Sequence, residues 1–401
     1  MHKGLTKRSA VASWAVGLVL VGCAGEDLDQ VQSLVAVTAV EEWLIDGHEA
    51  DLAPVAWVAA SDDGAAFVSQ GFDRLVLAID EEGRLRGSLG GRGEGPGEFA
   101  MISRMGMLGD TLWVYDRNLR RLTLFDGDLE LARVETWMGS SVTFEGVDFP
   151  FSTLQGVTPG WMIHTQFEAM PGTPESAVMR HGLTDLEGSL EHMVVEVPRG
   201  PSFAPLQSEA GIFGVRFPFA LVPMYAVSSN GRHSALVTVP MEGEHVGTIE
   251  VVTFDESGEE RNRHRVPFEV RDVPRAEADS MINARAEGLG NQFPDIVRTY
   301  RQRAWIPPFI PPVERVLVGR DGSVWLAMST DDEAMSRYRV VDSAGERVGE
   351  VGFSGAVRVA DGDSEQVWAV VTDDTGVGSV ARYRLLWDGT NSSGATDGNG
   401  G

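Results

Sequence analysis

A short turn motif recurs along this chain at the same place in successive sequence units. Each unit contains a strand, a loop, a second strand that ends in Asp, a turn that contains Gly, and a third strand. The turn has the form Asp-x-x-Gly at residues 80–83, 185–188, 255–258 and 342–345, and is shortened to Asp-Gly at 126–127 and 388–389. An Asp side chain caps such a turn, and Gly adopts the positive φ that the turn needs. The repeat therefore predicts a series of β-hairpins in one repeated all-β architecture.

The hairpin units predict a six-bladed β-propeller of four-stranded antiparallel blades. Their second strands are expected to begin near Ala66, Leu112, Trp161, Ser234, Val324 and Val367, and a further strand precedes each. The last unit lacks a fourth strand, and the segment near residues 40–45 reads as a strand without a blade. We expect this N-terminal strand to complete blade six, because ring closure removes exposed sheet edges. A β-sandwich is the competing all-β fold.

The glycine-rich run "LGGRGEGPGEFA", residues 89–100, allows two interpretations. A dinucleotide-binding loop needs G-x-G-x-x-G between a strand and a helix. Here the spacing fits only in relaxed form, Pro96 lies inside it, and a strand-like segment follows instead of a helix. We therefore predict a connection between two blades, with Phe99 buried between them and the glycines letting the chain cross.

The segment "GGRGEGPGEF…GDTLWVYDRNLRRLTLFD" resembles an NHL-type repeat and the related six-bladed propeller lipoproteins of bacteria. Asp116, Arg121, Leu122 and Phe125 match the D-x-x-x-x-R-[IL]-x-x-F pattern of that family. Asn118 lies one place earlier than the usual Asn, and the Pro that follows the Phe is missing. The full motif covers one blade, so the resemblance implies the fold and leaves the function open.

The N-terminus resembles a bacterial lipoprotein signal peptide. A positive segment with Lys3, Lys7 and Arg8 precedes an uncharged run that is too short to span a bilayer. The run ends in "LVGC", a lipobox-like sequence in which Cys23 would carry acyl chains such as palmitate. An ordinary signal peptide with a chance Cys is the alternative. The expected organisation is a signal peptide (1–22), a tether (23–33), the propeller (34–388) and a disordered Gly/Ser-rich tail (389–401).

Charge and cysteine usage restrict the partners and the chemistry. The formal net charge of −26 opposes binding to nucleic acid, so no nucleic-acid partner is expected. Cys23 is the only Cys and no Lys follows Lys7, which leaves no catalytic thiol and no Schiff-base or Walker-type lysine. Ala24 after the Cys resembles the pattern that enterobacteria sort to the outer membrane. We expect an envelope lipoprotein held on a membrane by its lipid, with the membrane face left open.

Two long insertions between blades offer places for a binding site. One covers residues 198–219, and the other covers 269–312 and should contain a helix with Pro274 in its first turn and Gly288 at its end. After this helix comes a cationic, aromatic segment. Its candidate binding residues for a carboxylate, a phosphate or a sugar are Arg298, Tyr300, Arg301, Arg303, Trp305 and Phe309. The alternative is a structural lid whose arginines pair with acidic blade loops.

Other polar residues are candidates for metal binding or for the lining of the central channel. Asp331, Asp332, Asp373 and Asp374 form two acidic pairs in equivalent loops, which are candidate Ca²⁺ ligands or, alternatively, turn caps. The histidines are scattered, so no metal site and no cofactor is predicted from spacing, although separate blades could assemble a zinc site. Arg104 and Arg358 are expected as polar residues on inner strands.

These observations favour a binding or scaffold module over an enzyme. The expected partner is an envelope protein or a small anionic or sugar ligand. The alternative is a metal-dependent propeller hydrolase or lyase, resembling the lactonases, with its site at the mouth of the channel.

Overall fold

A computed structural model describes residues 34–388 of the chain, except Ala53, Ser140, Ala210, Glu244 and Glu333. The predicted signal peptide, the lipidation site at Cys23, the tether and the Gly/Ser-rich tail lie outside the described residues. Within the described part, no helix combines the length and the apolar character needed to cross a membrane.

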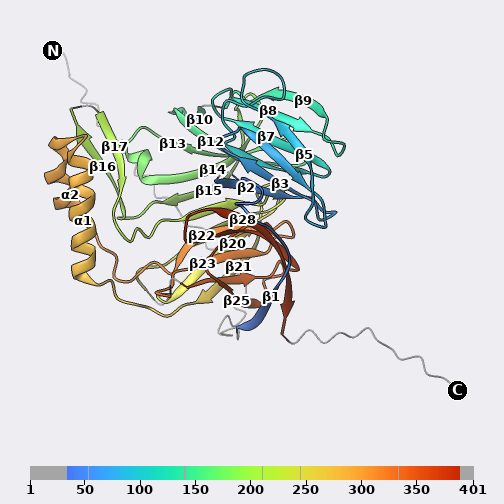
Figure 1. Cartoon of the computed structure of the whole chain (residues 1–401). Coiled ribbons are helices and arrows are strands. Elements are labelled where there is room, and N and C mark those ends of the chain that lie inside the picture. The colour runs from blue at the N-terminus through green and yellow to red at the C-terminus, as the bar shows by residue number, and fades with distance from the viewer. Residues whose placement is uncertain are drawn as a thin grey trace, which may run out of the picture. The chain divides into compact units, whose positions relative to one another are not determined.

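The described chain is almost entirely β-structure, arranged mainly in four-stranded antiparallel sheets (Figure 1). We number six sheets in chain order. Sheet 1 is β2 (Val55–Ala60), β3 (Ala66–Gln70), β4 (Leu75–Ile79) and β5 (Leu85–Gly90); sheet 2 is β6 (Arg104–Leu108), β7 (Thr111–Asp116), β8 (Arg121–Phe125) and β9 (Leu131–Thr136); sheet 3 is β12 (Phe151–Val157), β13 (Ile163–Glu168), β14 (Val178–Thr184) and β15 (Leu190–Pro198). Sheet 4 is β18 (Met224–Val227), β19 (Ser234–Thr238), β20 (Thr248–Phe254) and β21 (Glu260–Pro267); sheet 5 is β22 (Val313–Val318), β23 (Val324–Met328), β24 (Met335–Val341) and β25 (Val348–Ser354); sheet 6 is β26 (Ala356–Gly362), β27 (Gln366–Thr372), β28 (Gly378–Trp387) and β1 (Val35–Ile45). The predicted all-β chain of four-stranded antiparallel units is confirmed, and this architecture is typical of a β-propeller.

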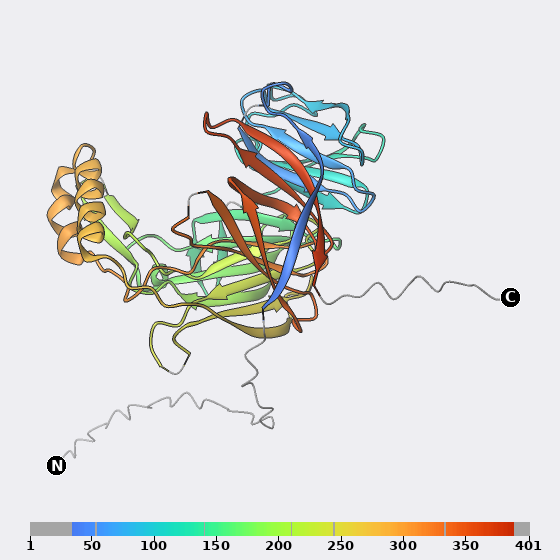
Figure 2. The same ribbon diagram turned by 60° about the horizontal axis from the view of Figure 1, so that its bottom comes forward.

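The strand β1 joins the two ends of the described chain. It runs antiparallel to β28, with Val37 opposite Trp387 and Ile45 opposite Val380. At its beginning, Val35 and Ala36 also pair in parallel with β25, which links sheets 5 and 6 into one eight-stranded sheet. Figure 2 shows β1 in blue alongside the red strands of the C-terminal sheet.

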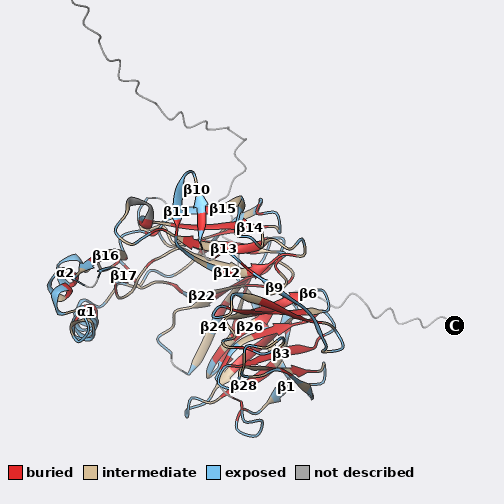
Figure 3. Cartoon of the chain, turned by 90° about the horizontal axis from the view of Figure 1, so that it is seen from above, coloured by how far each residue is buried: buried red, intermediate tan, exposed pale blue. Residues whose placement is uncertain are grey.

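The first strands of the six sheets contact one another in chain order. The contacting pairs are β2 with β6, β6 with β12, β12 with β18, β18 with β22, β22 with β26, and β26 with β2. Each sheet therefore has two neighbours, and the last sheet in the chain adjoins the first. The buried residues lie mainly along the strands of the sheets, including the second strands β3 and β7 (Figure 3).

The recurring Asp-x-x-Gly turns have the predicted geometry. In the turn at 80–83, Asp80 Oδ1 accepts hydrogen bonds from the amides of Glu82 and Arg84, and Gly83 has φ 82°. The turn at 255–258 repeats both features. A side chain with a Cβ is strained at such a φ, which explains the glycine. Local chemistry thus sets where these hairpins turn.

The second strands begin close to the predicted positions, except in sheet 3. There, Trp161 lies in the turn before β13, with φ 65°, instead of starting the strand. The preceding turn is closed by Thr158, whose carbonyl accepts a hydrogen bond from the amide of Trp161 at 2.9 Å. The turn therefore displaces the strand start by two residues.

The glycine-rich run connects sheet 1 to sheet 2 and is followed by the strand β6. Phe99 is fully buried in a cluster that contains residues of both sheets, among them Leu89 and Met105. Asp116 Oδ2 accepts hydrogen bonds from the amides of Ala100 and Met101, at 2.6 and 2.9 Å. The guanidinium of Arg121 donates to the carbonyls of Glu94, Gly95 and Glu98. Phe99 in the run, together with Asp116 and Arg121 after it, therefore anchors the connection between sheets 1 and 2.

The two long insertions pack against each other. The first forms a hairpin of β16 (Phe203–Ser208) and β17 (Gly211–Arg216), and the second forms α1 (Arg275–Gly290) and α2 (Val297–Arg303). The second helix was not predicted, and α1 ends two residues beyond Gly288. Their common core contains Leu206, Val215, Phe217, Ile282, Ala286, Ile296 and Tyr300. A further hairpin, β10 (Val142–Phe144) with β11 (Val147–Phe149), was also not predicted.

Candidate functional site

The first strands of all six sheets line one cavity of about 440 Å³, which we call the channel cavity. Its lining residues are Val55, Ala56, Trp57, Arg104, Gln155, Tyr225, Ala226, Val227, Arg315, Val316, Leu317, Arg358, Val359 and Ala360. Three of these described residues are arginines and none is acidic. The expectation that Arg104 and Arg358 are polar residues on inner strands agrees with their positions on β6 and β26.

The side chain of Arg104 has no carboxylate partner among the described residues. Its Nη1 donates to Gln155 Oε1 at 3.1 Å, and its Cζ lies 4.9 Å from the centroid of the Trp57 ring. Burial lowers the pKa of Arg104 to about 10, so the guanidinium remains protonated at neutral pH. Neither an amide oxygen nor an aromatic face neutralises this charge, although both stabilise it.

Arg358 and Arg315 add two further charges to the channel cavity. Arg358 Nη2 donates to the carbonyl of Val55 at 2.7 Å. Burial lowers the pKa of Arg358, and the nearby charge of Arg315 lowers it further. Among the described residues, the guanidinium of Arg315 has neither a hydrogen-bond acceptor nor an ion-pair partner. The cavity thus holds three like charges whose mutual repulsion an anion would relieve.

A loop of sheet 4, residues 228–233, crosses the end of the channel where β18 leaves it. The carbonyl of Ser229 accepts a hydrogen bond from the amide of Met107 in sheet 2, and Ser229 Oγ donates to Asp361 Oδ1 in sheet 6 at 2.9 Å. The first strand of sheet 4 contacts those of sheets 3 and 5. The loop therefore reaches past these neighbours to contact sheets 2 and 6. Gly106 allows this approach, since a Cβ there would lie 2.2 Å from the Ser229 carbonyl oxygen.

Buried polar groups hold this crossing loop in place. Asp361 Oδ2 accepts a hydrogen bond from the amide of Ala60 at 2.6 Å, and Asn230 Nδ2 donates to the carbonyl of Arg320 at 2.9 Å. Arg320 in turn donates to the carbonyl of Ser61 and pairs with Asp363. Burial raises the pKa of Asp361 to about 6. These bonds join four sheets at this end of the channel.

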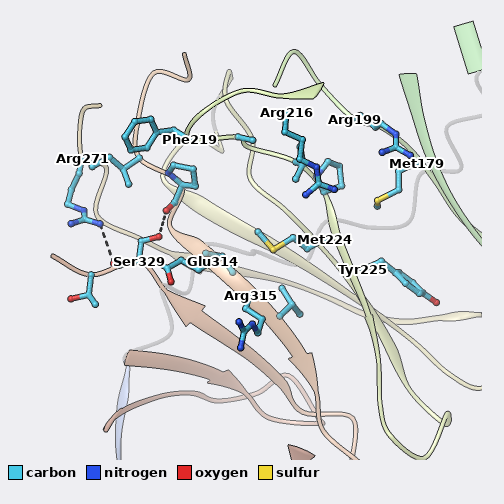
Figure 4. Close-up of a pocket in the computed structure, with 18 of the residues that line it drawn as sticks. Met179, Arg199, Arg216, Phe219, Met224, Tyr225, Arg271, Glu314, Arg315 and Ser329 are labelled. Carbon is cyan, nitrogen blue, oxygen red and sulfur yellow. Dashed lines mark hydrogen bonds between the residues drawn. The ribbon is translucent and has the colours of Figure 1, made fainter. Parts of the chain in front are cut away.

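Towards the insertions, the channel cavity is continuous with a larger cavity of about 1110 Å³. The two cavities share Tyr225, Arg315 and Val316. The charged residues that line the larger cavity are Arg199, Arg216, Arg271, Arg315, Asp272, Glu277, Glu314 and Asp331. Arg271 pairs with Asp331 at 2.6 Å, whereas Arg216 has no ion-pair partner within the described chain. In Figure 4, Arg271 lies near one edge of the view and Arg199 near the other, with Met224 and Arg216 between them.

Two buried histidines, His164 and His181, contact Tyr225 beside the larger cavity. The ring of His181 stacks on Tyr225 with the centroids 4.0 Å apart, and the Tyr225 hydroxyl lies 3.3 Å from His164 Nδ1. Burial lowers the pKa of His164 to about 4 and that of His181 to about 3, so both rings are neutral at physiological pH. Neither ring nitrogen of His181 has a hydrogen-bond partner in the described part of the chain. The two histidines therefore add polar groups to this wall and no charge.

The candidate binding residues of the second insertion do not gather on one surface. Tyr300 is buried in the core of the insertions, and Phe309 is buried against Phe268 at a ring distance of 5.5 Å. Trp305 is partly buried against the same core as Tyr300. Arg298, Arg301 and Arg303 are exposed, and Arg303 donates to the carbonyl of Pro205 at 2.9 Å. None of these six residues lines the channel cavity or the larger cavity. Ligand binding by this segment stays a prediction.

The two acidic pairs are engaged in local contacts. Asp331 pairs with Arg271, and Asp332 Oδ1 accepts a hydrogen bond from the amide of Ala334. Asp373 Oδ1 accepts from the amides of Thr375 and Val377, while its Oδ2 lies 2.7 Å from His48 Nε2. Asp374 is exposed. Within the described ranges, no three His, Cys, Asp or Glu side chains are grouped closely enough to hold a metal ion. Calcium binding at these pairs likewise stays a prediction.

Arg315 and the crossing loop are the parts of the site that the sequence reasoning missed. A signal for Arg315 was present, since Arg104, Arg315 and Arg358 each occur within a short strand of mostly apolar residues. An arginine in three of the six expected first strands is a signal, because charged residues are uncommon in strands that pack inside a fold. The crossing loop carries no comparable signal, since its partners Arg320 and Asp361 lie 90 and 132 residues away in sequence.

Comparisons with known proteins give only remote likenesses. No protein-family model and no curated protein sequence matches the chain. A candidate exported protein of Bacteroides fragilis aligns with a TM-score of 0.46 and 10% identity over 90% of this chain and 97% of its own. Virginiamycin B lyase of Staphylococcus aureus aligns with a TM-score of 0.37 and 12% identity over 83% of this chain and 95% of its own. A member of the DUF4221 family from Bacteroides vulgatus aligns with a TM-score of 0.45 and 10% identity over 89% of this chain and 98% of its own. Likenesses at this level establish neither a shared fold nor a shared function.

Proposed function

We propose that this chain is an exported, lipid-anchored, six-bladed β-propeller that binds a small anionic ligand in its channel cavity. It acts as a binding module of the cell envelope. The proposal has three parts, which are the closed propeller, the location at the envelope and the anion site, and each has its own support.

The order of contacts among the sheets supports six blades and ring closure. Each first strand contacts the first strands of two other sheets, and β26 contacts β2. The antiparallel pairing of β1 with β28 supplies the fourth strand of sheet 6 from the other end of the chain. A strand exchanged in this way holds the ring closed, because separating the first blade from the last would break a strand pair.

The support for an envelope location comes from the sequence alone. The positive segment, the short apolar run and the lipobox-like "LVGC" together have the form of a lipoprotein signal. More than one acyl chain at Cys23 would give stable membrane anchoring. The short polar tether after Cys23 would keep the propeller close to the membrane surface.

The single observation that carries the anion site is the clustering of Arg104, Arg315 and Arg358 without a neutralising carboxylate. Around them is a chain of formal net charge −26. Arg104 and Arg358 are partly buried and Arg315 is exposed to the cavity, so three like charges that face one cavity repel one another. A carboxylate, phosphate or sulfate group would supply the missing acceptors, since the guanidinium fork matches these oxyanions.

Equilibrium dialysis of the full-length mature lipoprotein in detergent against radiolabelled inorganic phosphate and small carboxylates tests this site. We expect saturable binding near one anion per chain. Arg315→Ala should weaken it at least tenfold, since a charge-assisted hydrogen bond contributes about 1.5–3 kcal/mol. Arg315→Lys should retain part of the binding through its charge.

Two further variants separate this site from other possibilities. Arg84→Ala removes an exposed arginine of the turn at 80–83 and should leave binding unchanged. Arg301→Ala tests the cationic segment predicted from the sequence. If Arg301→Ala abolishes binding while Arg315→Ala does not, the ligand is held by the second insertion and the channel assignment is wrong.

A further inference from the structure

A small apolar pocket opens beside the larger cavity, and the proposed anion site does not include it. Its volume is about 240 Å³. We call it the side pocket, and its lining residues are Val197, Pro198, Arg199, Gly200, Ala220, Leu221, Val222, Pro223, Met224, Val237, Thr238, Val239, Met241, Pro311 and Val313. Among them only Arg199 and Thr238 have polar side chains. Arg199 is already occupied by an ion pair with Glu168 at 2.9 Å and by the face of Phe203.

The side pocket is continuous with the larger cavity. The two share Arg199, Ala220, Val222, Pro223, Met224, Pro311 and Val313. The larger cavity in turn shares Tyr225, Arg315 and Val316 with the channel cavity. Met224 and Tyr225 are adjacent in β18, so one strand contributes to the apolar and to the cationic end of this space. On β22 (Val313–Val318), Val313 lines the side pocket and Arg315, two residues further on, lines the channel cavity, a separation of about 7 Å along a strand that one small molecule can span.

The two ends of this continuous space favour different chemical groups. The channel cavity offers three arginines, whereas the side pocket offers aliphatic and proline walls. An apolar group that enters the side pocket leaves water and makes van der Waals contacts with its walls. The side pocket is small beside the 1110 Å³ cavity, so it fits a short chain or a small ring.

We infer that the ligand is a small amphipathic anion whose charged group lies among Arg104, Arg315 and Arg358 and whose apolar end fills the side pocket. This inference rests on the proposed anion site and adds the class of molecule that the site selects. The site favours such a molecule because it contacts both ends. A bare oxyanion binds only the arginines, and a neutral apolar molecule fills only the side pocket.

The test measures how a homologous series of alkyl phosphates, from methyl to pentyl, displaces radiolabelled inorganic phosphate from the full-length lipoprotein. Displacement reports only on molecules that compete for the arginines, so partitioning into detergent does not imitate it. We expect affinity to rise roughly fourfold for each added methylene, the factor that corresponds to burying one CH₂ group, until the side pocket is filled.

Variants at Met241 locate the apolar end of the ligand. Met241 lines the side pocket and neither of the other two cavities. Met241→Glu should abolish the gain with chain length and leave inorganic phosphate binding within about twofold, whereas Met241→Leu should keep the gain. Met138→Glu places the same change at an exposed methionine and should have no effect.

The outcomes separate this inference from the proposed function. If inorganic phosphate and the small carboxylates fail to bind, the anion site itself is wrong. If phosphate binds and affinity does not rise with chain length, the anion site stands and the amphipathic ligand is refuted. If affinity rises equally in the wild type and in a folded Met241→Glu variant, the apolar end lies elsewhere and the side pocket is refuted. The wild-type series decides the ligand class even if Met241→Glu does not fold.

Discussion

At the scale of single residues, the same side chain serves different purposes according to its partners. The Nη atoms of Arg121 donate to three carbonyls of the glycine-rich connection, and those of Arg320 to the carbonyl of Ser61 and to two carboxylates. Both side chains are structural, because their Nη atoms donate to fixed acceptors of the chain. Arg315 differs, since its guanidinium has no acceptor among the described residues and faces a cavity. The partners of the guanidinium, and not the residue type, therefore distinguish a structural arginine from one available to a ligand.

Asp361 makes stability depend on pH in a direction opposite to that of an Asp whose pKa is lowered by hydrogen bonds or ion pairs. Burial raises its pKa to about 6 from an ordinary value of 3.8, so the folded state favours the protonated carboxyl. Its contribution to the free energy of unfolding is complete below about pH 4 and is lost as the pH rises through 6. The loss amounts to about 3 kcal/mol between these limits.

The measurement compares urea unfolding of the wild type and Asp361→Asn between pH 4.5 and 8. His164 and His181 contribute in the opposite direction, because their lowered pKa values make the folded state lose stability as the pH falls. The difference between the two proteins cancels the histidines and isolates Asp361. The wild type should lose stability relative to Asp361→Asn as the pH rises, and parallel curves would contradict the assignment.

At the scale of elements, local chemistry sets the hairpins while distant contacts set the site. The Asp-x-x-Gly turns, the strand starts and the connection through Phe99 could be predicted from the sequence, because each depends on residues within about 20 positions. The crossing loop could not, since Ser229 meets Met107 and Asp361 only when sheets 2, 4 and 6 come together. The hairpin β16–β17 and the helix α2 were missed for the same reason, because their common core forms between two insertions.

The exchanged strand β1 gives an element-scale prediction. Val37 on β1 is buried in the core of sheets 5 and 6, whereas its neighbour Thr38 is exposed. Val37→Asp should lower the free energy of unfolding by about 3 kcal/mol or more, since it buries an unpaired charge. Thr38→Asp changes the same strand on its exposed side and should have little effect.

Thermal unfolding followed by circular dichroism measures both variants. Val37→Asp should lower the Tm by roughly 5 °C or more. Equal Tm values for the two variants would mean that β1 does not contribute to the stability of the closed ring.

At the scale of the whole molecule, charge is segregated. Acidic residues outnumber basic ones by 59 to 33, yet the channel cavity contains only arginines among its charged residues that the structure describes. The acidic net charge opposes binding to nucleic acid and to other acidic surfaces. The cationic lining of the channel cavity favours anions over cations and neutral molecules. The six first strands create this interior together, so no single blade contains the site.

A crystal structure of the protein soaked with an anomalously scattering oxyanion, such as tungstate, tests the central claim most directly, because it locates the bound anion without assuming its identity. The account predicts an anomalous peak within hydrogen-bond distance of Arg315 and bounded by Arg104 and Arg358. In crystals of Arg315→Ala, the peak should be lost or greatly weakened. Peaks confined to the second insertion around Arg298 and Arg301, or a channel cavity that stays empty at saturating tungstate, would contradict it.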